Sequence, residues 1–487
     1  MKIKLIALTL ACVLFVGIVG CSEPPERFEL MTTEPTSTTA TVATEATEAV
    51  EETTTETVAT TTAKTTTAAP EPDTDDSEPD EIDEPDEIDT DDTAATSSAA
   101  TTTAATTAAT TVATVATTAA TTAATTPPAG NATLVGTYQP IFGYMGNAVS
   151  RSQLRDSATL AFIKKHYNSI TAENEMKPDA LLSSTRITVE AAKGRGYVIP
   201  EGYNEAFVPT INFSILDDYM KIAHDNGLKI RFHTLVWHSQ TPRWFFKVDY
   251  LDASGTTNDV SKEVLDKRME MYIKTIIKHV YDSPHGNTVY AWDVVNEYVT
   301  NRGTGRWEAI YGNDNSYVIN AFKYAHEQLT AMGKRSSVKL FYNDYNTYEH
   351  TTTIVNLINE INKGGKYCDG IGMHMHLDVG YPTISRLGTT IDAFQRAGFE
   401  IQITELDVTL NGAYYSGARK TVADQEKFYG DLFRLLIQKK NGGANITSVT
   451  IWGLYDSVSW RRAYTPLIFT GIDQPKGSFD EVINAAR

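Results

Sequence analysis

The sequence is poor in cysteine: its 487 residues contain three, Cys12, Cys21 and Cys368. Cys12 lies in an apolar run that we expect to be removed from the mature protein, and we expect Cys21 to carry lipid, for reasons given below. Only Cys368 would then remain as a free thiol, so no disulfide could form within the chain. A fold without cross-links has to be held together by its hydrophobic core.

Basic side chains are also too few for a nucleic-acid-binding surface. The chain has 42 Lys and Arg against 61 Asp and Glu, a formal charge of −19. The acidic excess lies in the first 130 residues, which hold 23 acidic and 4 basic side chains, so the remainder has 38 of each. Because phosphate binding needs a basic stripe, this balance argues against nucleic acid as the main partner and suits an uncharged polymer.

An apolar run from Leu5 to Val19 follows two lysines and is short for a membrane span. It ends in Ile18-Val19-Gly20-Cys21, which resembles the bacterial lipobox. We therefore expect residues 1–20 to be a lipoprotein signal peptide and Cys21 to be lipidated. Acyl chains on that residue would provide stable membrane anchoring. The protein would be extracytoplasmic, anchored by lipid to the cell surface of a bacterial envelope.

Residues 21–130 consist largely of Thr, Ala, Val and Glu, with an acidic block from Glu71 to Asp92. Aromatic side chains are almost missing from this stretch, so it cannot bury enough apolar surface to offset its chain entropy. We predict a disordered N-terminal tether, extended by its like charges. The density of threonine raises O-glycosylation as a hypothesis.

Residues 131–487 have the pattern of one α/β catalytic domain. Short apolar runs predict strands, and amphipathic segments such as Ile215 to Asn226 and Val260 to Tyr281 predict helices between them. About eight such units indicate a (β/α)₈ TIM barrel. An open doubly wound sheet is the alternative, weakened because no Gly-rich phosphate loop follows the first strand. The expected strands are 138–144, 169–173, 228–232, 288–292, 338–342, 370–373, 401–404 and 449–452.

Two glutamates follow expected strands: Glu297 ends the fourth, in Trp292-Asp293-Val294-Val295-Asn296-Glu297, and Glu405 ends the seventh. Catalytic groups of such barrels lie where strands end and loops begin. Two carboxyl groups brought together from separate strands are what glycoside cleavage needs, one to protonate the leaving oxygen and one to attack the anomeric carbon. Either glutamate alone would more often be a polar strand cap or an ion-pair member, so the pair carries the interpretation.

Six segments are shared, in order and spacing, with a known family. They are Ser169 to Lys177, His233 to Pro242, Trp292 to Glu297, Tyr342 to Asn346, Ile403 to Asp407, and Trp452-Gly453 with Asp456 and Ser459-Trp460-Arg461. From about Phe142 to Lys476 the domain resembles the family 10 glycoside hydrolases, the endo-β-1,4-xylanases.

The resemblance implies hydrolysis of internal β-1,4-xylosidic bonds with retention of configuration, with Glu297 as acid/base and Glu405 as nucleophile. Retention requires carboxyl groups about 5–5.5 Å apart. We expect the negative charge of Glu405 to raise the pKa of Glu297. Xylan and xylo-oligosaccharides would be the partners, no cofactor is implied, and a monomer is expected.

The resemblance also assigns supporting residues. Asn296 is expected to bond the sugar 2-hydroxyl, and His376 and Asp407 to orient the nucleophile. Trp452 and Trp460 would crowd the position where glucose carries its hydroxymethyl group. The expected substrate-binding residues are Glu173, Asn174, Lys177, His233, Trp237, Gln240, Asn296, His374, His376, Trp452 and Trp460.

Alternatives remain open at several of these positions. His374 and His376 are two apart on an expected strand and face the same way, so a metal site is the alternative to sugar binding, which the companion residues favour. A core role is the alternative for the histidines and tryptophans. A broader β-1,4-glycanase and a non-catalytic glycan-binding lipoprotein are the competing functions.

The chain departs from the family pattern at four places. His374 stands where Gln is usual, Phe232 where a Gly commonly precedes His233, Pro178 where a Trp is often found, and Gly477-Ser478 where Pro-Ala is usual. A titratable ring at 374 is expected to affect the pH profile. An extra loop at residues 194–210 is expected to cap one end of the cleft.

Overall fold

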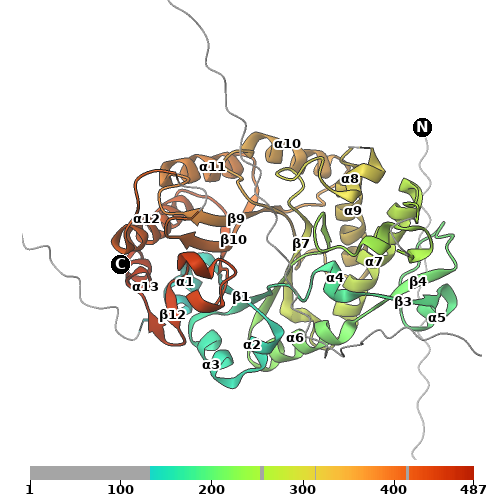
Figure 1. The fold of residues 1–487 in the computed structure, drawn as a ribbon, viewed down its shortest axis with the longest axis horizontal. Coiled ribbons are helices and arrows are strands. Elements are labelled where there is room, and N and C mark those ends of the chain that lie inside the picture. The colour runs from blue at the N-terminus through green and yellow to red at the C-terminus, as the bar shows by residue number, and fades with distance from the viewer. Residues whose placement is uncertain (1–131, 253–256, 313, 413–415) are drawn as a thin grey trace, which may run out of the picture. The chain divides into compact units, whose positions relative to one another are not determined.

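The computed structural model describes residues 132–252, 257–312, 314–412 and 416–487. Within them, eight parallel strands form a closed barrel in the order β5-β2-β1-β11-β10-β9-β8-β7, and pairing of β5 with β7 completes the ring (Figure 1). This confirms the predicted (β/α)₈ barrel. The strands are β1 (Tyr144–Val149), β2 (Ser169–Ala172), β5 (Lys229–Phe232), β7 (Val289–Asn296), β8 (Lys339–Asp344), β9 (Gly370–Asp378), β10 (Glu400–Thr409) and β11 (Ile446–Ile451).

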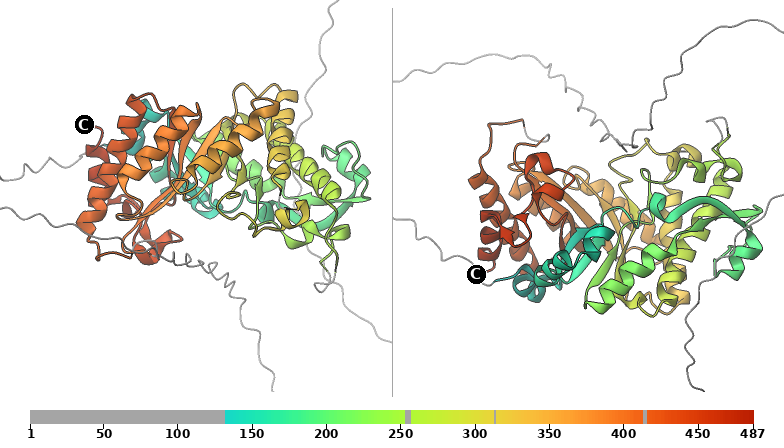
Figure 2. Two further views of the ribbon diagram at one scale, coloured as in Figure 1. Left: turned by 90° about the horizontal axis from the view of Figure 1, so that it is seen from above. Right: turned by 60° about the horizontal axis from the view of Figure 1, so that its bottom comes forward.

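Helices connect these strands and lie outside the barrel in all three views (Figures 1 and 2). Their apolar faces turn inward: in α6 the buried residues follow helical spacing from Ile215 to Ala223. The helices are α2 (Arg151–Arg155), α3 (Ser157–His166), α6 (Phe213–Asp225), α7 (Lys262–Asp282), α8 (Arg306–Tyr311), α9 (Ser316–Ala331), α10 (Thr351–Ile361), α11 (Ile384–Arg396), α12 (Val422–Asn441) and α13 (Gly477–Asn484).

The predicted strand at 138–144 is wrong for most of its length. Residues Leu134–Phe142 form helix α1, and β1 begins only at Tyr144. Thr133 caps the helix by accepting a bond from the Gly136 amide at 3.1 Å. Leu134, Tyr138 and Phe142 recur at helical spacing and are buried. The short apolar run thus fitted both periods, and packing against β1 and β11 selected the helix.

The extra loop at residues 194–210 is part of a small insertion that follows β2. Following α4 (Pro178–Leu181), strands β3 (Leu182–Thr188) and β4 (Phe207–Ile211) pair antiparallel around α5 (Val189–Gly194). The Tyr203 hydroxyl lies 2.6 Å from that of Tyr250, which joins this hairpin to the 3-10 turn Val248–Tyr250. That the loop at residues 194–210 caps one end of the cleft stays a prediction.

Phe232, one of the departures from the family pattern, packs away from the barrel interior. Its ring stacks on Trp292 at a centroid distance of 4.2 Å, and Trp292 in turn donates to the Tyr281 hydroxyl of α7 at 3.0 Å. The strand neighbours Arg231 and His233 consequently face inward. The larger side chain therefore does not crowd the inward-facing site.

The predicted signal peptide, Cys21 lipidation and tether fall on residues outside those that the structure describes. In the part that it does describe, no helix combines the length and apolarity needed to cross a membrane. Cys368 is buried as a free thiol.

Candidate active site

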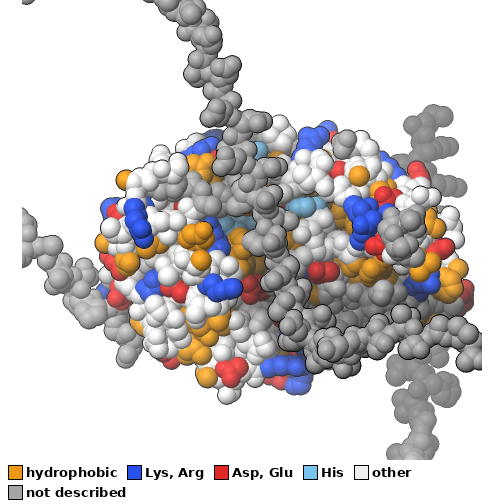
Figure 3. All heavy atoms as spheres, viewed as in Figure 1, with side chains coloured by type: hydrophobic (Ala, Val, Ile, Leu, Met, Phe, Trp, Pro, Cys, Tyr) orange, Lys and Arg blue, Asp and Glu red, His pale blue; other side chains and the backbone are white. Residues whose placement is uncertain are grey.

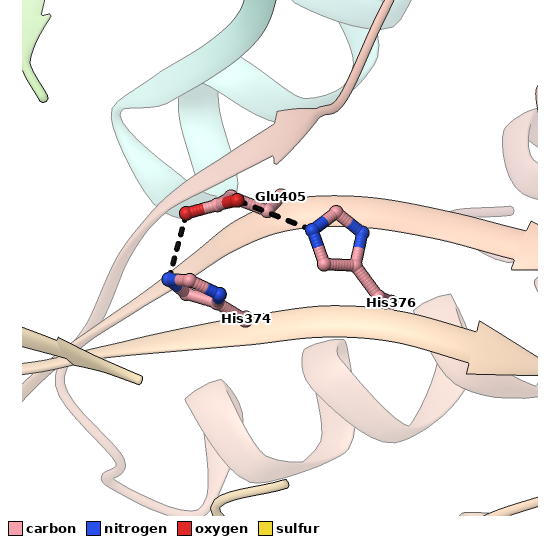
Figure 4. A group of neighbouring side chains, drawn as sticks. All are labelled: His374, His376 and Glu405. Carbon is pink, nitrogen blue, oxygen red and sulfur yellow. Dashed lines mark hydrogen bonds and ion pairs between the residues drawn. The ribbon is translucent and has the colours of Figure 1, made fainter. Parts of the chain in front are cut away.

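The local backbone of β10 aims Glu405 into the barrel mouth. Glu405 has φ of 54°, and the register of β10 against β9 shifts between Thr404 and Asp407. Such a bulge breaks the alternation of side chains, and a left-handed φ is costly for a residue other than Gly. The bulge turns the Glu405 side chain toward two histidines of the adjacent strand (Figure 4).

Glu297 reaches the same place from β7 by a similar device. It has φ of 57° directly after the strand, and its amide donates to the carbonyl of Asn343 at 2.8 Å. Its carboxyl Oε2 accepts a hydrogen bond from Trp237 Nε1 at 2.9 Å. Trp237 ends the short strand β6 (Val236–Trp237), which pairs with β7.

His374 lies between the two carboxyl groups. Its Nε2 is 2.7 Å from Oε1 of Glu405, and its Nδ1 is 3.7 Å from Oε1 of Glu297. The two glutamates therefore approach opposite nitrogens of a single imidazole ring. The structure brings together, across one ring, the pair that the sequence picked out from separate strands.

His376 forms a second support for Glu405. Its Nε2 is 3.1 Å from Glu405 Oε2, and its Nδ1 is 2.9 Å from Asp407 Oδ2. Asp407 is itself held, since it accepts from Trp460 Nε1 at 3.0 Å and from Arg461 at 2.8 Å. A chain of charge-assisted bonds thus fixes the orientation of one oxygen of Glu405.

Asn343 was missed as a site residue, although the sequence contains it in a recognised segment. Its Nδ2 donates to Glu405 Oε1 at 2.9 Å and to Asn296 Oδ1 at 3.0 Å, while its Oδ1 accepts from Thr404 at 2.8 Å. It is the polar residue after the apolar end of β8, the same signal that marked Glu297. The side-chain amide of Asn343 thereby fixes the positions of Asn296 and Glu405 relative to each other.

A buried ion pair lies below the carboxyl groups, and its members were likewise missed as site residues. Arg231 bonds both oxygens of Asp293, through Nη2 at 2.6 Å and through Nη1, and reaches Gln402 across the barrel at 2.8 Å. His233 Nδ1 lies 3.0 Å from Asp293 Oδ2. Burial lowers the pKa of His233, against the opposing charge of Glu405.

Burial raises the pKa of Glu297 to about 7; the charge of Glu405 adds to the rise, and the charge of His374 works against it. The expected contribution of Glu405 is therefore present, but loss of water around the carboxyl group has the larger effect. Burial would also raise the pKa of Glu405. The charges of His374 and His233, with hydrogen bonds from both strand β9 histidines, instead hold it well below its usual range.

His376 has its pKa raised to about 9, because the charge of Asp407 and its hydrogen bond outweigh the effect of burial. A cationic imidazole at neutral pH can donate to Glu405 and Asp407 at once. Each carboxylate then accepts a hydrogen bond from the ring and keeps its own negative charge. The environments of Glu297 and Glu405 thus separate into one protonated acid and one ionised carboxylate.

Of the other expected substrate residues, Glu173 and Lys177 lie close enough to this centre to interact with the charge of Glu405. Lys177 Nζ lies 4.8 Å from the Trp237 ring centroid and donates to Asn174 Oδ1 at 2.8 Å. Burial raises the pKa of Glu173 and lowers that of Lys177. The Gln240 backbone has φ of 39°, and its carbonyl accepts from the Asp179 amide at 2.9 Å.

The two tryptophans differ in exposure. Trp452 is buried, with its ring 5.5 Å from that of His233, whereas Trp460 is 52% exposed and lies 4.8 Å from the His376 ring. An exposed indole beside a buried polar cluster is suited to packing against a sugar face. On the face seen in Figure 3, histidine side chains appear near the middle and charges of both signs are dispersed around them.

One cluster in this site also has the composition of a metal ligand set. His374, His376 and Glu405 each offer one ligand atom, and these atoms lie within 4.8 Å of one another.

Comparison with known proteins agrees with this geometry. The model of glycosyl hydrolase family 10 matches residues 134–485. Endo-1,4-beta-xylanase A of Butyrivibrio fibrisolvens is 43% identical over 363 residues, which cover 73% of this chain and 85% of that protein. The bifunctional endo-1,4-beta-xylanase XylA of Ruminococcus flavefaciens is 37% identical, over 73% of this chain but only 34% of that longer protein.

Solved structures resemble the chain over the same region. The xylanase modules of Clostridium thermocellum complexed with xylohexaose superpose with a TM-score of 0.60 at 29% identity, covering 72% of this chain and 67% of that one. An intracellular xylanase of Thermoanaerobacterium saccharolyticum in complex with xylotetraose gives 0.57 at 30% identity, covering 72% and 97%.

Proposed function

This chain belongs to glycosyl hydrolase family 10, and from that premise we propose that it is an endo-1,4-β-xylanase that retains the configuration of the sugar it cleaves. The observation that carries the mechanism is the approach of Glu297 and Glu405 to opposite nitrogens of His374. One carboxyl group has a pKa near neutrality and the other is held ionised. Those are the two states that an acid and a nucleophile need.

In the first step, the Glu405 carboxylate attacks the anomeric carbon and the bond from that carbon to the leaving oxygen breaks. Glu297 gives its proton to that oxygen, so the shortened chain leaves as a neutral alcohol. The product is a glycosyl ester on Glu405. Bonds from His376 and Asn343 to the two oxygens of Glu405 keep the attacking atom oriented.

In the second step, water replaces Glu405 at the anomeric carbon. Glu405 carries no charge while it is esterified, so the charge that helped to raise the pKa of Glu297 is gone. Glu297, now ionised, takes a proton from the water, whose oxygen bonds to carbon as the ester is released. Two inversions at one carbon give net retention.

The surrounding residues supply binding and selection. Asn296 receives its orientation from Asn343 and is proposed to bond the sugar 2-hydroxyl, an interaction that strengthens as charge develops at the anomeric carbon. Glu173, Asn174, Lys177, His233 and Gln240 are proposed to bond neighbouring sugar hydroxyls. Trp237, Trp452 and Trp460 are proposed as the apolar surfaces. The complexes of similar xylanases with xylohexaose and xylotetraose support xylo-oligosaccharides as the ligands of this cleft.

Proton NMR of a xylan digest tests the proposed reaction. Internal cleavage should release a mixture of xylo-oligosaccharides, and the reducing ends should first appear as the β-anomer before mutarotation. First appearance of the α-anomer would exclude the double displacement. Faster cleavage of a soluble cellulose derivative than of xylan would replace the substrate assignment with a broader glycanase.

The N-terminal residues lead to a separate proposal: Cys21 carries the lipid that anchors the enzyme to a bacterial surface as an extracytoplasmic monomer. Its support is the sequence Ile18-Val19-Gly20-Cys21 after an apolar run, and a tether of about a hundred residues would let the catalytic domain reach an insoluble polymer. Metabolic labelling with a fatty-acid analogue tests it. Label should depend on Cys21, and equal labelling of Cys21→Ala would exclude the anchor.

A further inference from the structure

We propose that His374, His376 and Glu405 form a binding site for a borderline transition-metal ion such as Zn²⁺, and that an ion bound there blocks the nucleophile. The three side chains converge from two adjacent strands, with both rings directed at the same carboxyl group (Figure 4). The binding of the ion depends on these three side chains and not on the proposed function. The blocking effect rests on the proposed function.

The donor set is the one that zinc takes in proteins, two imidazole nitrogens and one carboxylate. His374 Nε2 lies 2.7 Å from Glu405 Oε1, and His376 Nε2 lies 3.1 Å from Glu405 Oε2. Zinc bonds of about 2.0–2.2 Å need ligand atoms about 3.3 Å apart in a tetrahedron. These two contacts are slightly closer than that but end on different oxygens of Glu405, and one ligand atom from each of the three residues lies within 4.8 Å of the other two. Small side-chain rotations would therefore assemble the site.

A second observation is the support behind His376. Metal-ligating histidines usually donate the other ring N–H to a carboxylate, which fixes the tautomer and leaves the second nitrogen for the ion. His376 Nδ1 has this partner in Asp407 at 2.9 Å, and Arg461 holds Asp407 at 2.8 Å. The remaining nitrogen, Nε2, is directed at Glu405, and a bound ion would take the place of the proton that this nitrogen donates to Glu405 at neutral pH.

His374 supplies the donor that converts an orienting pair into a three-ligand site. It lies two residues before His376 on β9, so both rings project from the same face of the strand. Its Nδ1 is buried and makes no hydrogen bond among the described residues, only the longer contact of 3.7 Å with Glu297 Oε1. A small rotation would therefore break no hydrogen bond at Nδ1.

An ion at this position would occupy Glu405 as a ligand and take away the lone pair that attacks the sugar. Water would complete the coordination. Mg²⁺ and Ca²⁺ prefer sites made only of oxygen ligands, so they should not bind here. This difference gives the experiment its internal control.

The direct test is isothermal titration of the folded protein with ZnCl₂, followed by the same titration of His374→Gln and Glu405→Gln. The wild-type chain should bind one Zn²⁺ that both variants lose, and CaCl₂ should give no heat from this site. Excess xylotriose should compete with the Zn²⁺. Identical Zn²⁺ stoichiometry and affinity in all three proteins would overturn the site.

A second histidine pair has to be separated from the proposed one. His224 and His285 lie on another part of the domain with ring centroids 4.5 Å apart. His224→Ala removes that pair. This variant should still show the Zn²⁺ binding heat that His374→Gln abolishes, and xylotriose should still compete with the Zn²⁺. Loss of that heat in His224→Ala would place the ion elsewhere and contradict the proposal.

Turnover of xylan then tests blocking. Wild type and His374→Gln are each compared with their own rate in EDTA, and the concentration of Zn²⁺ that halves the rate should rise by about tenfold or more in His374→Gln. Addition of EDTA should restore the wild-type rate. Site-dependent Zn²⁺ binding without inhibition would refute the blocking step only, whereas a wild-type protein that binds Zn²⁺ but never cleaves xylan would refute the proposed function instead.

Discussion

Asp407 and His376 form a pair in which Oδ2 of the buried aspartate lies 2.9 Å from Nδ1 of the ring, and the opposite nitrogen of that ring lies 3.1 Å from Glu405. The pairing raises the pKa of His376 to about 9 and lowers that of Asp407. Asp407, two positions after Glu405, therefore helps to keep a proton on the His376 nitrogen that faces Glu405.

Asp407→Asn should slow turnover of xylan by about 10- to 100-fold, because a hydrogen bond to a charged group contributes about 1.5–3 kcal/mol. The amide keeps the shape but cannot hold the charge on His376, so the pKa of His376 should fall from about 9. Steady-state rates and NMR titration of the ring measure the two effects. A slower enzyme with an unchanged His376 pKa would indicate a packing defect and not the loss of this pair.

The pH dependence of kcat/KM on xylan should decline above about pH 7. The pKa of Glu297 is raised to about 7, so the carboxyl keeps its proton below that pH and loses it as the pH rises through that value. Beyond it, each pH unit should cost about tenfold in rate. The control is an aryl xylobioside whose phenol leaves without protonation, for which the decline should disappear. The same decline for both substrates would assign it to another group.

Trp460 should affect substrate affinity more than folding, because its ring is half exposed beside His376. Trp460→Ala should raise KM for xylan by up to about tenfold and increase activity on soluble glucan relative to xylan. Trp460→Phe keeps an aromatic face but loses the N–H that donates to Asp407 at 3.0 Å. If the two variants have equal KM values, the ring face contributes nothing to binding.

Arg231 should be critical for stability. Arg231→Met leaves Asp293 buried without its main counter-charge, at a cost of about 3–5 kcal/mol in the free energy of unfolding. Arg434→Met is the matched control, since its pairs with Asp431 and Glu481 are exposed and should contribute less than about 1 kcal/mol. Denaturant unfolding measures both. Equal losses would mean that the buried pair has no special role.

Much of the architecture could be predicted from the sequence, because the buried strands are short apolar runs bounded by polar residues. The same rule led to error at Tyr138, where apolar residues satisfied two periods and only contacts with β1 and β11 selected the helix. Glu297 and Glu405 could be placed at strand ends. Their left-handed backbone angles could not, since a bulge depends on pairing with neighbouring strands.

Within the site, sequence indicated residue types better than contacts. Asn343 and Arg231 were overlooked as site residues because their partners, Glu405 and Asp293, come from other strands and no spacing along the chain links them. Nor could sequence show that His374 lies between the carboxyl groups, because that position depends on the separation of β7 from β10 around the ring. Sequence also could not show that burial is the main cause of the raised pKa of Glu297, because burial depends on how the strands pack together.

Covalent trapping tests the role of Glu405 most directly. A 2-deoxy-2-fluoro xylobioside with an activated aryl leaving group should form the first ester but hydrolyse it slowly, because the fluorine destabilises both transition states. Peptide mass spectrometry of the trapped protein should find one sugar label, attached to Glu405. A label on Glu297 or on any other residue, or inactivation with no covalent label, would contradict the assignment of Glu405 as nucleophile.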